Sequence, residues 1–190
     1  LPALQAELEA KLALLDAGED AIKAAEKDVA QLREVFHGRA VALSEARGEA
    51  AKSLEVAVAK ELAPLKLGAA RFRVALNPIS DGEAGAHGLE RVGFEIATVE
   101  GADFGPLTRI ASGGELSRFA LALKVALAEA SPPAVLVFDE IDRGVGGAVA
   151  DAVGERLQRL ASGTQVLLVT HSPQVAARGT THFRISRTGA

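Results

Sequence analysis

The sequence predicts an α/β lobe with a parallel βαβ core, preceded by a long coiled-coil helix. Large apolar residues at intervals of seven predict the helix. Two continuous apolar runs separated by a helical stretch predict two buried parallel strands with a crossover helix. With 190 residues, the chain is long enough for one hydrophobic core and an extended arm. We place the boundary at Pro64, with the arm in residues 1–64 and the lobe in residues 65–190.

Composition and charge exclude several classes of protein. Hydrophobic residues make up 48% of the chain and charged residues 24%, values of a globular protein, which excludes wholesale disorder. The absence of cysteine excludes a disulfide framework, a thiol nucleophile and a Cys-based metal site. The net charge of −4 gives no general attraction to nucleic acid or anionic membrane. No apolar stretch reaches the roughly 18 residues that span a bilayer, and no signal peptide is evident. We therefore expect a cytoplasmic chain with no membrane partner.

The arm is defined by one strict heptad column. Its members are Leu1, Leu8, Leu15, Ile22, Val29, Phe36 and Leu43. The companion column, three residues later, is only partly apolar, and the phase shifts after Leu43 as a four-residue stutter would require. Gly18 is a candidate break, His37-Gly38 is a weaker one, and Pro64 ends the helix. The alternative is a helix packed on a globular core, which usually has a wider apolar stripe. Unless Gly18 turns the arm into a hairpin, its partner helix is expected elsewhere.

The lobe is expected to alternate strands and helices. Residues 71–76 and 92–96 alternate polar and apolar side chains, as half-buried strands do, around a Gly-rich loop. A helix is expected from 115 to 130, because it must stop before Pro132-Pro133. The remaining elements, in order, are a buried strand at 134–138, a helix at 148–160, a buried strand at 165–169 and a short edge strand at 182–186.

The first motif that carries chemistry is Ser112-Gly113-Gly114-Glu115, at the start of the first lobe helix. The two glycines allow close approach to the backbone, and the free N–H groups of a helix N-terminus attract anions. The same residues also fit a structural alternative, because Ser-x-x-Glu is the pattern of a capping box. Both roles are compatible, since a capping hydroxyl can also face a phosphate.

The second and third motifs follow the two buried strands. Asp139 and Glu140 come directly after the first apolar run, and Asp142 follows in a Gly-rich loop. His171 comes after the second apolar run. Ligands of open α/β sheets bind at the carboxyl ends of the strands, so Asp139 is suited to a Mg²⁺ shell, Glu140 to orienting water and His171 to contacting phosphate. The structural alternatives are solvated acids at a strand end and a surface or helix-capping histidine.

The three motifs together, over residues 107–178, resemble the carboxyl-terminal half of an ATP-binding-cassette (ABC) ATPase head. The heptad arm resembles SMC-type ATPases rather than transporters. More narrowly, three segments resemble the RecN family of bacterial DNA-repair proteins: Ala111–Arg118, Phe138–Asp142 and Thr170–Ala177. The chain departs from that family at Ser172, where Leu is usual, and at Arg143.

The resemblance implies a set of site residues and the cofactors ATP and Mg²⁺. Asp139 would bind Mg²⁺, and Glu140 and His171 would be catalytic. The nucleotide-binding residues would be Ser112, Gly113, Gly114, Glu115 and Asp142. Ser112–Glu115 would be the signature motif of the head. Its Ser112, Gly113 and Gly114 would act on the nucleotide of a second head, and Asp142 would couple the two sites. Arg118 fits either a structural or a nucleotide-sensing role.

One part of such a site is missing from the sequence. A Walker A loop requires Gly-Lys, and none of the seven lysines follows a glycine. The resemblance therefore implies an amino-terminal Walker A half as a partner, together with a second head and DNA, in a nucleoid-associated complex. We expect this chain alone not to hydrolyse ATP.

Two alternatives remain open at this stage. The chain could belong to another SMC-type, chromosome-organising head, although Asp142-Arg143-Gly144-Val145-Gly146-Gly147 favours the RecN family. It could also be a non-catalytic coiled-coil interaction module with an inert α/β end. DNA binding enters through the resemblance alone, because Arg178, Arg184 and Arg187 are too few for a basic patch.

Overall fold

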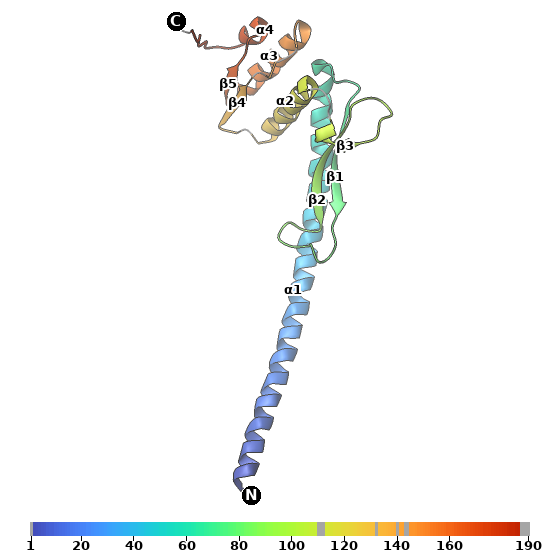
Figure 1. The fold of residues 1–190 in the computed structure, drawn as a ribbon, viewed down its shortest axis with the longest axis vertical. Coiled ribbons are helices and arrows are strands. Elements are labelled where there is room, and N and C mark those ends of the chain that lie inside the picture. The colour runs from blue at the N-terminus through green and yellow to red at the C-terminus, as the bar shows by residue number, and fades with distance from the viewer. Residues whose placement is uncertain (1, 110–112, 132, 140, 143–144, 187–190) are drawn as a thin grey trace. The chain divides into compact units, whose positions relative to one another are not determined.

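A computed structural model of the chain describes residues 2–109, 113–131, 133–139, 141–142 and 145–186, except the side chains of residues 2–4, 10, 12–17, 109 and 129. The chain divides into two compact units. The first unit contains Leu1–Arg47 and Pro78–Glu90, and the second contains Gly48–Asn77 and Arg91–Ala190. The predicted fold class is confirmed, with a long helix followed by an α/β lobe that contains a parallel strand pair (Figure 1).

Helix α1 runs without interruption from Pro2 to Leu62. The predicted breaks at Gly18 and at His37-Gly38 are therefore wrong. An isolated glycine costs a helix only about 1 kcal/mol, and the strong helix formers around it outweigh that cost. The helix gives way to a 3₁₀ turn, η1 (Ala63–Leu65), as the proline at position 64 requires. Lys66 then takes a left-handed conformation, with φ of 56°, and ends the segment.

In the first unit, the loop of residues 78–90 packs against α1. The Arg47 guanidinium donates a hydrogen bond of 2.9 Å to the backbone oxygen of His87. The Ser44 hydroxyl donates one of 2.5 Å to Glu90 Oε2. Gly88 has a φ of 86°, and a Cβ at this position would lie 3.2 Å from Leu43 Cδ2, so the loop needs glycine there.

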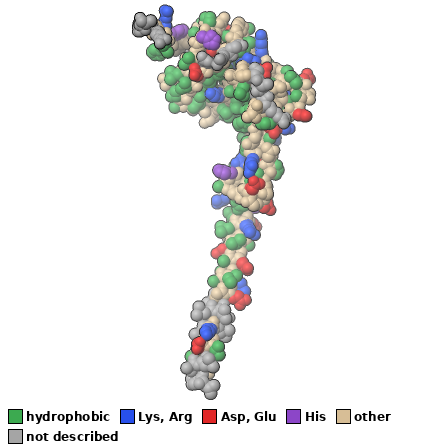
Figure 2. Space-filling view, in the orientation of Figure 1, with side chains coloured by type: hydrophobic (Ala, Val, Ile, Leu, Met, Phe, Trp, Pro, Cys, Tyr) green, Lys and Arg blue, Asp and Glu red, His purple; other side chains and the backbone are tan. Residues whose placement is uncertain are grey.

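The heptad column of α1 is exposed wherever its side chains are described. The exposed fractions are 57% for Leu8, 60% for Ile22, 47% for Val29, 37% for Phe36 and 37% for Leu43. Figure 2 shows hydrophobic side chains on the surface along this part of the helix. An apolar stripe of this kind is typical of a helix that packs against another helix.

In the second unit, strands β1 (Arg71–Pro78), β2 (Glu90–Ala97) and β3 (Gly105–Pro106) form one sheet in that order. The first two strands match the predicted strands, whereas the two-residue strand β3 and the following 3₁₀ turn η2 (Leu107–Arg109) were not predicted. Strand β3 pairs antiparallel with β2, with Ile96 opposite Gly105. Strand β3 has only two residues, which is too short for an alternation of polar and apolar side chains to be recognised in the sequence.

The βαβ unit is formed as predicted. Strand β4 (Val135–Asp139) and strand β5 (Gln165–Val169) pair in parallel, and helix α3 (Ala148–Leu160) connects them. Helix α2 (Gly113–Ala130) precedes the unit, and the short helix α4 (Pro173–Ala176) follows it.

Two expectations about strands are wrong. Strands β4 and β5 were expected to be buried on both faces, but alternate residues are exposed, including 62% of Val137 and 55% of Val169. Residues 182–186 form no strand in the described structure, and Phe183 and Ile185 are 89% and 94% exposed. A strand needs a neighbour for its backbone hydrogen bonds, and no second strand within the described residues pairs with this segment.

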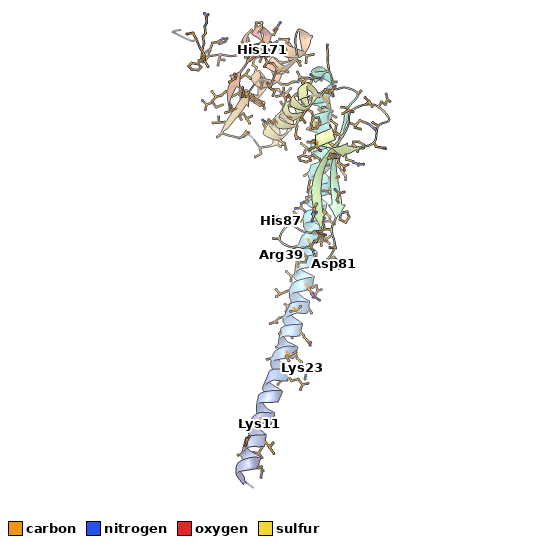
Figure 3. The ribbon with its side chains drawn as sticks, in the orientation of Figure 1. Lys11, Lys23, Arg39, Asp81, His87 and His171 are labelled. Carbon is orange, nitrogen blue, oxygen red and sulfur yellow. The ribbon has the colours of Figure 1, made fainter. Side chains whose placement is uncertain are left out.

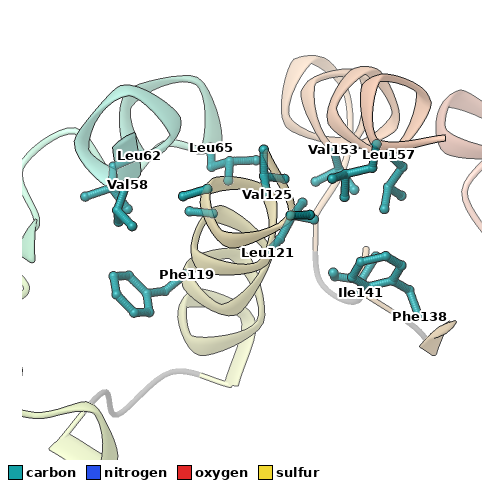
Figure 4. Close-up of a cluster of buried hydrophobic side chains, with 14 of the residues drawn as sticks. Val58, Leu62, Leu65, Phe119, Leu121, Val125, Phe138, Ile141, Val153 and Leu157 are labelled. Atoms are coloured by element: carbon teal, nitrogen blue, oxygen red, sulfur yellow. The ribbon is translucent and has the colours of Figure 1, made fainter. Parts of the chain in front are cut away.

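The core of the second unit is formed by the end of α1 and by helices α2 and α3. Val58 and Leu62 of α1 lie close to Phe119 and Val125 of α2 in one buried cluster, which continues to Val153 of α3 (Figure 4). No helix in the described parts of the chain is both long enough and apolar enough to cross a membrane.

Candidate functional site

The sheet register brings two of the predicted motifs to one edge. Asp139 is the last residue of β4 and pairs with Val169, the last residue of β5. His171 follows β5 by two residues (labelled in Figure 3). The carboxyl ends of both strands, and the turns that follow them, therefore lie side by side. This is where open α/β sheets bind their ligands.

The signature motif lies at the start of α2. Ser112 lies outside the described residues, while Gly113 and Gly114 are the first two residues of the helix and Glu115 lies in its first turn. A Cβ built at Gly113 would meet no atom of the described residues within 4 Å, so this part of the chain leaves the backbone open to approach. The Ser117 hydroxyl donates a hydrogen bond of 2.9 Å to the Gly113 oxygen within the helix. The helix is 18 residues long, which gives its N-terminus a substantial dipole.

The acidic pair is only partly described. Asp139 is exposed at the end of β4, and Glu140 lies outside the described residues. Among the described side chains, no three His, Asp or Glu residues gather into a metal site. A single exposed carboxylate nevertheless fits Mg²⁺, because this ion is commonly held by one or two carboxylates together with substrate phosphates and water.

Asp142 lies in a different environment from the one expected of a loop acid. Its side chain is fully buried. Its Oδ2 accepts a hydrogen bond of 2.5 Å from the Thr170 hydroxyl and one of 3.1 Å from the Ser172 backbone N–H. Asp142 thus contacts the two residues that flank His171. His171, between the two donors, is itself exposed.

Sequence reasoning assigned no role to Thr170 or to the backbone of Ser172. Both partners lie about thirty positions from Asp142, with sequence separations of 28 and 30. No local pattern reveals such a contact. Their position directly after the apolar run of β5 was the only available signal.

Close to this edge, α4 is fixed to α3. A Cβ at Gly154 of α3 would lie 3.3 Å from the Val175 Cα and 2.8 Å from the Arg178 Cγ, so only glycine allows the approach. The Arg178 guanidinium donates a hydrogen bond of 2.7 Å to Asp151, and this bond raises the pKa of Arg178 above its usual value. These contacts hold the segment that follows His171 against α3.

The fold is similar to that of SMC head domains. The chain aligns with the Smc head domain with an extended coiled coil, bound to the C-terminal domain of ScpA, from Pyrococcus furiosus. The TM-score is 0.53 and the identity 21%, over 67% of this chain and 30% of that one. A structure from work on ATP-driven dimerization and DNA stimulated activation of SMC ATPases aligns at a TM-score of 0.50 and 19% identity, over 72% of this chain and 78% of that one.

Within this class, the chain is similar to proteins named DNA repair protein RecN. It is 47% identical over 146 residues to that of Rickettsia bellii, which covers 77% of this chain and 26% of the relative. It is 40% identical over 201 residues to that of Mycobacterium tuberculosis, which covers 96% of this chain and 34% of the relative. The resemblance to RecN is thereby confirmed. The chain spans between 26% and 34% of the length of these relatives.

A family profile also matches the part of the chain that contains the motifs. It is described as "AAA domain, putative AbiEii toxin, Type IV TA system" and matches residues 111–177. The matched segment begins at the signature motif and ends after His171, so it contains all three motifs.

Proposed function

We propose that this chain is the carboxyl-terminal lobe of an SMC-like, ABC-type ATPase head that acts in the repair of DNA double-strand breaks by recombination. The observation that carries the proposal is the pairing of β4 with β5, which brings Asp139 and the His171 turn to one edge. Similarity to proteins named DNA repair protein RecN, over most of this chain, supports the biological role.

In this proposal each site residue has a defined role. Mg²⁺, when bound, neutralises charge on the nucleotide phosphates, and Asp139 holds it. Glu140 positions and deprotonates the attacking water. His171 donates a hydrogen bond to the γ-phosphate, and its exposure leaves it accessible for this contact.

The signature motif is proposed to act on the nucleotide of a second head. Ser112, Gly113 and Gly114 would present N–H groups and the positive end of the α2 dipole to the γ-phosphate. Glu115 would support this turn from within the helix. The open backbone at Gly113 supports this role. ATP would thus join two heads, and its hydrolysis would release them.

The lobe is proposed to work with an amino-terminal half that carries the Walker A loop. Parallel sheets are normally covered on both faces, yet Val137 and Val169 are more than half exposed. The exposed alternate residues of β4 and β5 therefore support a further layer or strand from that partner. In the same way, the exposed heptad column of α1 supports an antiparallel or parallel partner helix in the arm, for which we keep the range 1–64.

DNA is the proposed substrate of the assembled protein, held or bridged between heads and arms. The net charge of −4 gives this no support from the chain as a whole. The proposal for DNA therefore depends on the similarity to RecN.

The decisive experiment compares ATP turnover by this chain alone, by a separately prepared Walker A half, and by their mixture, with and without DNA. We expect turnover only in the mixture. Glu140→Gln should abolish turnover and retain ATP-dependent dimerisation, because the water would be bound without being activated. Glu100→Gln, at an exposed acid 40 positions before Glu140, is the matched control and should leave turnover unchanged.

Assembly of the mixture is verified by analytical ultracentrifugation. An assembled mixture that hydrolyses no ATP would refute the proposal and favour a non-catalytic interaction module. Turnover that survives Glu140→Gln would refute the role of this residue.

A further inference from the structure

The buried carboxylate of Asp142 joins the two turns that carry the site. Asp142 follows β4 by three residues, and its partners Thr170 and Ser172 follow β5. Its Oδ2 accepts the Thr170 hydroxyl at 2.5 Å and the Ser172 N–H at 3.1 Å. The Ser172 N–H also lies 3.0 Å from the Thr170 hydroxyl oxygen, which closes a three-membered network.

His171 lies between the two residues that Asp142 holds. Thr170 is fixed through its side chain and Ser172 through its backbone, and Ser172 is itself 6% exposed. The backbone on both sides of His171 is therefore anchored to the turn after β4, while the imidazole extends into solvent. Fixing the backbone on both sides restricts the directions in which the ring can point.

The network is costly, which argues against a purely stabilising purpose. Asp142 is completely buried, and within the described structure its Oδ1 has no hydrogen-bond partner. A buried oxygen without a partner lowers the stability of a fold, and an apolar side chain of similar size would avoid that loss. What an apolar residue could not do is accept hydrogen bonds from both neighbours of His171.

We propose that Asp142 is a positioning residue that sets the orientation of His171 through Thr170 and the Ser172 backbone, so that the turns after β4 and β5 move as one body. The inference rests on the proposed function, in which His171 contacts the γ-phosphate. It assigns Asp142 a role inside its own head, in place of a direct contact with nucleotide.

The first test measures the network directly, in this chain and without nucleotide. NMR-detected hydrogen exchange follows the Ser172 amide in the wild type and in Asp142→Ala, Thr170→Val and Thr170→Ser. We expect exchange to accelerate by about tenfold in Asp142→Ala, because the hydrogen bond from the Ser172 amide to Asp142 Oδ2 is lost. Amides of the α2 and α3 core should be unchanged, which shows that the variant is folded. An unchanged Ser172 amide in a folded Asp142→Ala would overturn the inference.

The threonine variants keep the test decisive if Asp142→Ala fails to fold. Thr170→Val removes the hydroxyl and keeps the shape of the side chain, so the Ser172 amide should exchange faster than in the wild type. Thr170→Ser keeps the hydroxyl and should restore the wild-type rate. Equal exchange in both variants would overturn the network.

The second test asks whether Asp142 acts through His171 in the complete head. Asp142→Ala should lower kcat by about 10- to 100-fold, as loss of an orienting partner commonly does, with nucleotide Kd within about twofold. In a His171→Ala background the same change should cost almost nothing more, because the ring to be oriented is gone. If the fold-reductions in kcat of Asp142→Ala and His171→Ala multiply in the double variant, the inference is overturned.

The two proposals fail in distinguishable ways. If His171→Ala leaves turnover unchanged, the proposed role of His171 fails, and this inference fails with it. If His171→Ala is slow and a folded Asp142→Ala turns over at the wild-type rate, the proposed function stands and only the positioning role of Asp142 is refuted.

Discussion

Replacing Glu61 with glutamine would test what fixes the end of α1 to the lobe. Glu61 Oε2 accepts a hydrogen bond of 2.9 Å from Arg156 Nε, and its Oε1 accepts one of 2.6 Å from Arg159. The side chains of Glu61 and Arg156 are only 10% and 8% exposed, whereas that of Arg159 is 46% exposed. Glutamine keeps the size of the side chain but leaves the buried Arg156 with only the exposed carboxylate of Glu155, 3.4 Å away, as a counter-charge.

The magnitude follows from burial. Removing one partner of a buried ion pair costs about 3–5 kcal/mol, because the remaining charge stays desolvated. The half-exposed Arg159 adds at most about 1 kcal/mol, since solvent screens it. For a chain of this size, each kcal/mol lowers the melting temperature by about 2–4 °C, so a total of about 3–6 kcal/mol predicts a decrease of about 6–24 °C.

The assay is thermal and urea unfolding of this chain, followed by circular dichroism. Glu49→Gln is the matched control on the same helix, because the Glu49–Lys52 pair is fully exposed and its loss should leave the midpoint unchanged. Replacing Glu61 and Arg156 together by leucine should recover most of the lost stability, since neither charge is then buried. If Glu61→Gln lowers the free energy of unfolding by less than about 1 kcal/mol, the reasoning is refuted. A loss that small is typical of a surface ion pair and not of a buried one.

Two further changes test the packing and the exposed sheet face. Gly154→Ala should lower stability by about 1–3 kcal/mol in urea unfolding, because its Cβ would meet the Val175 backbone. Gly48→Ala, in open space within α1, should raise stability by about 0.5–1 kcal/mol, and equal effects at both sites would contradict the model of packing. Val137→Glu should leave the unfolding midpoint unchanged but weaken binding of the Walker A half by at least about tenfold in calorimetry, and undiminished binding would exclude this face from the interface.

The spacing of apolar residues predicted most of the helices and strands, because the buried face of each element is what gives its sequence a period. Helices α2 and α3 and strands β1, β2, β4 and β5 all follow from apolar spacing. The same reasoning failed at residues 182–186, where alternation is present but no described strand lies alongside. It also failed at Gly18, where the surrounding helix formers outweigh one glycine. A local pattern shows which secondary structure a segment prefers. A strand also needs a neighbouring strand for its backbone hydrogen bonds.

The site was predictable as far as topology determines it. Two parallel strands joined by a helix must end at one edge, so the proximity of Asp139 to the turn after β5 followed from the sequence. The burial of Asp142 did not, because an acid in a Gly-rich loop is normally solvated. Its partners lie 28 and 30 residues away, and only the packed turns reveal them.

In our proposal, the exposed face of β4 and β5 links assembly of the head to completion of its ATP site. In our proposal the partner that covers Val137 and Val169 is the one that supplies the Walker A loop, so binding and catalytic competence arise in one step. The carboxyl ends of the same two strands carry Asp139 and the His171 turn, and a covered sheet would hold these ends more rigidly than a two-stranded one. Weakening the apolar contact should therefore reduce turnover in proportion to the fraction of assembled head. At saturating concentrations of the partner, a variant such as Val137→Glu should recover wild-type turnover, whereas a change in the site itself should not.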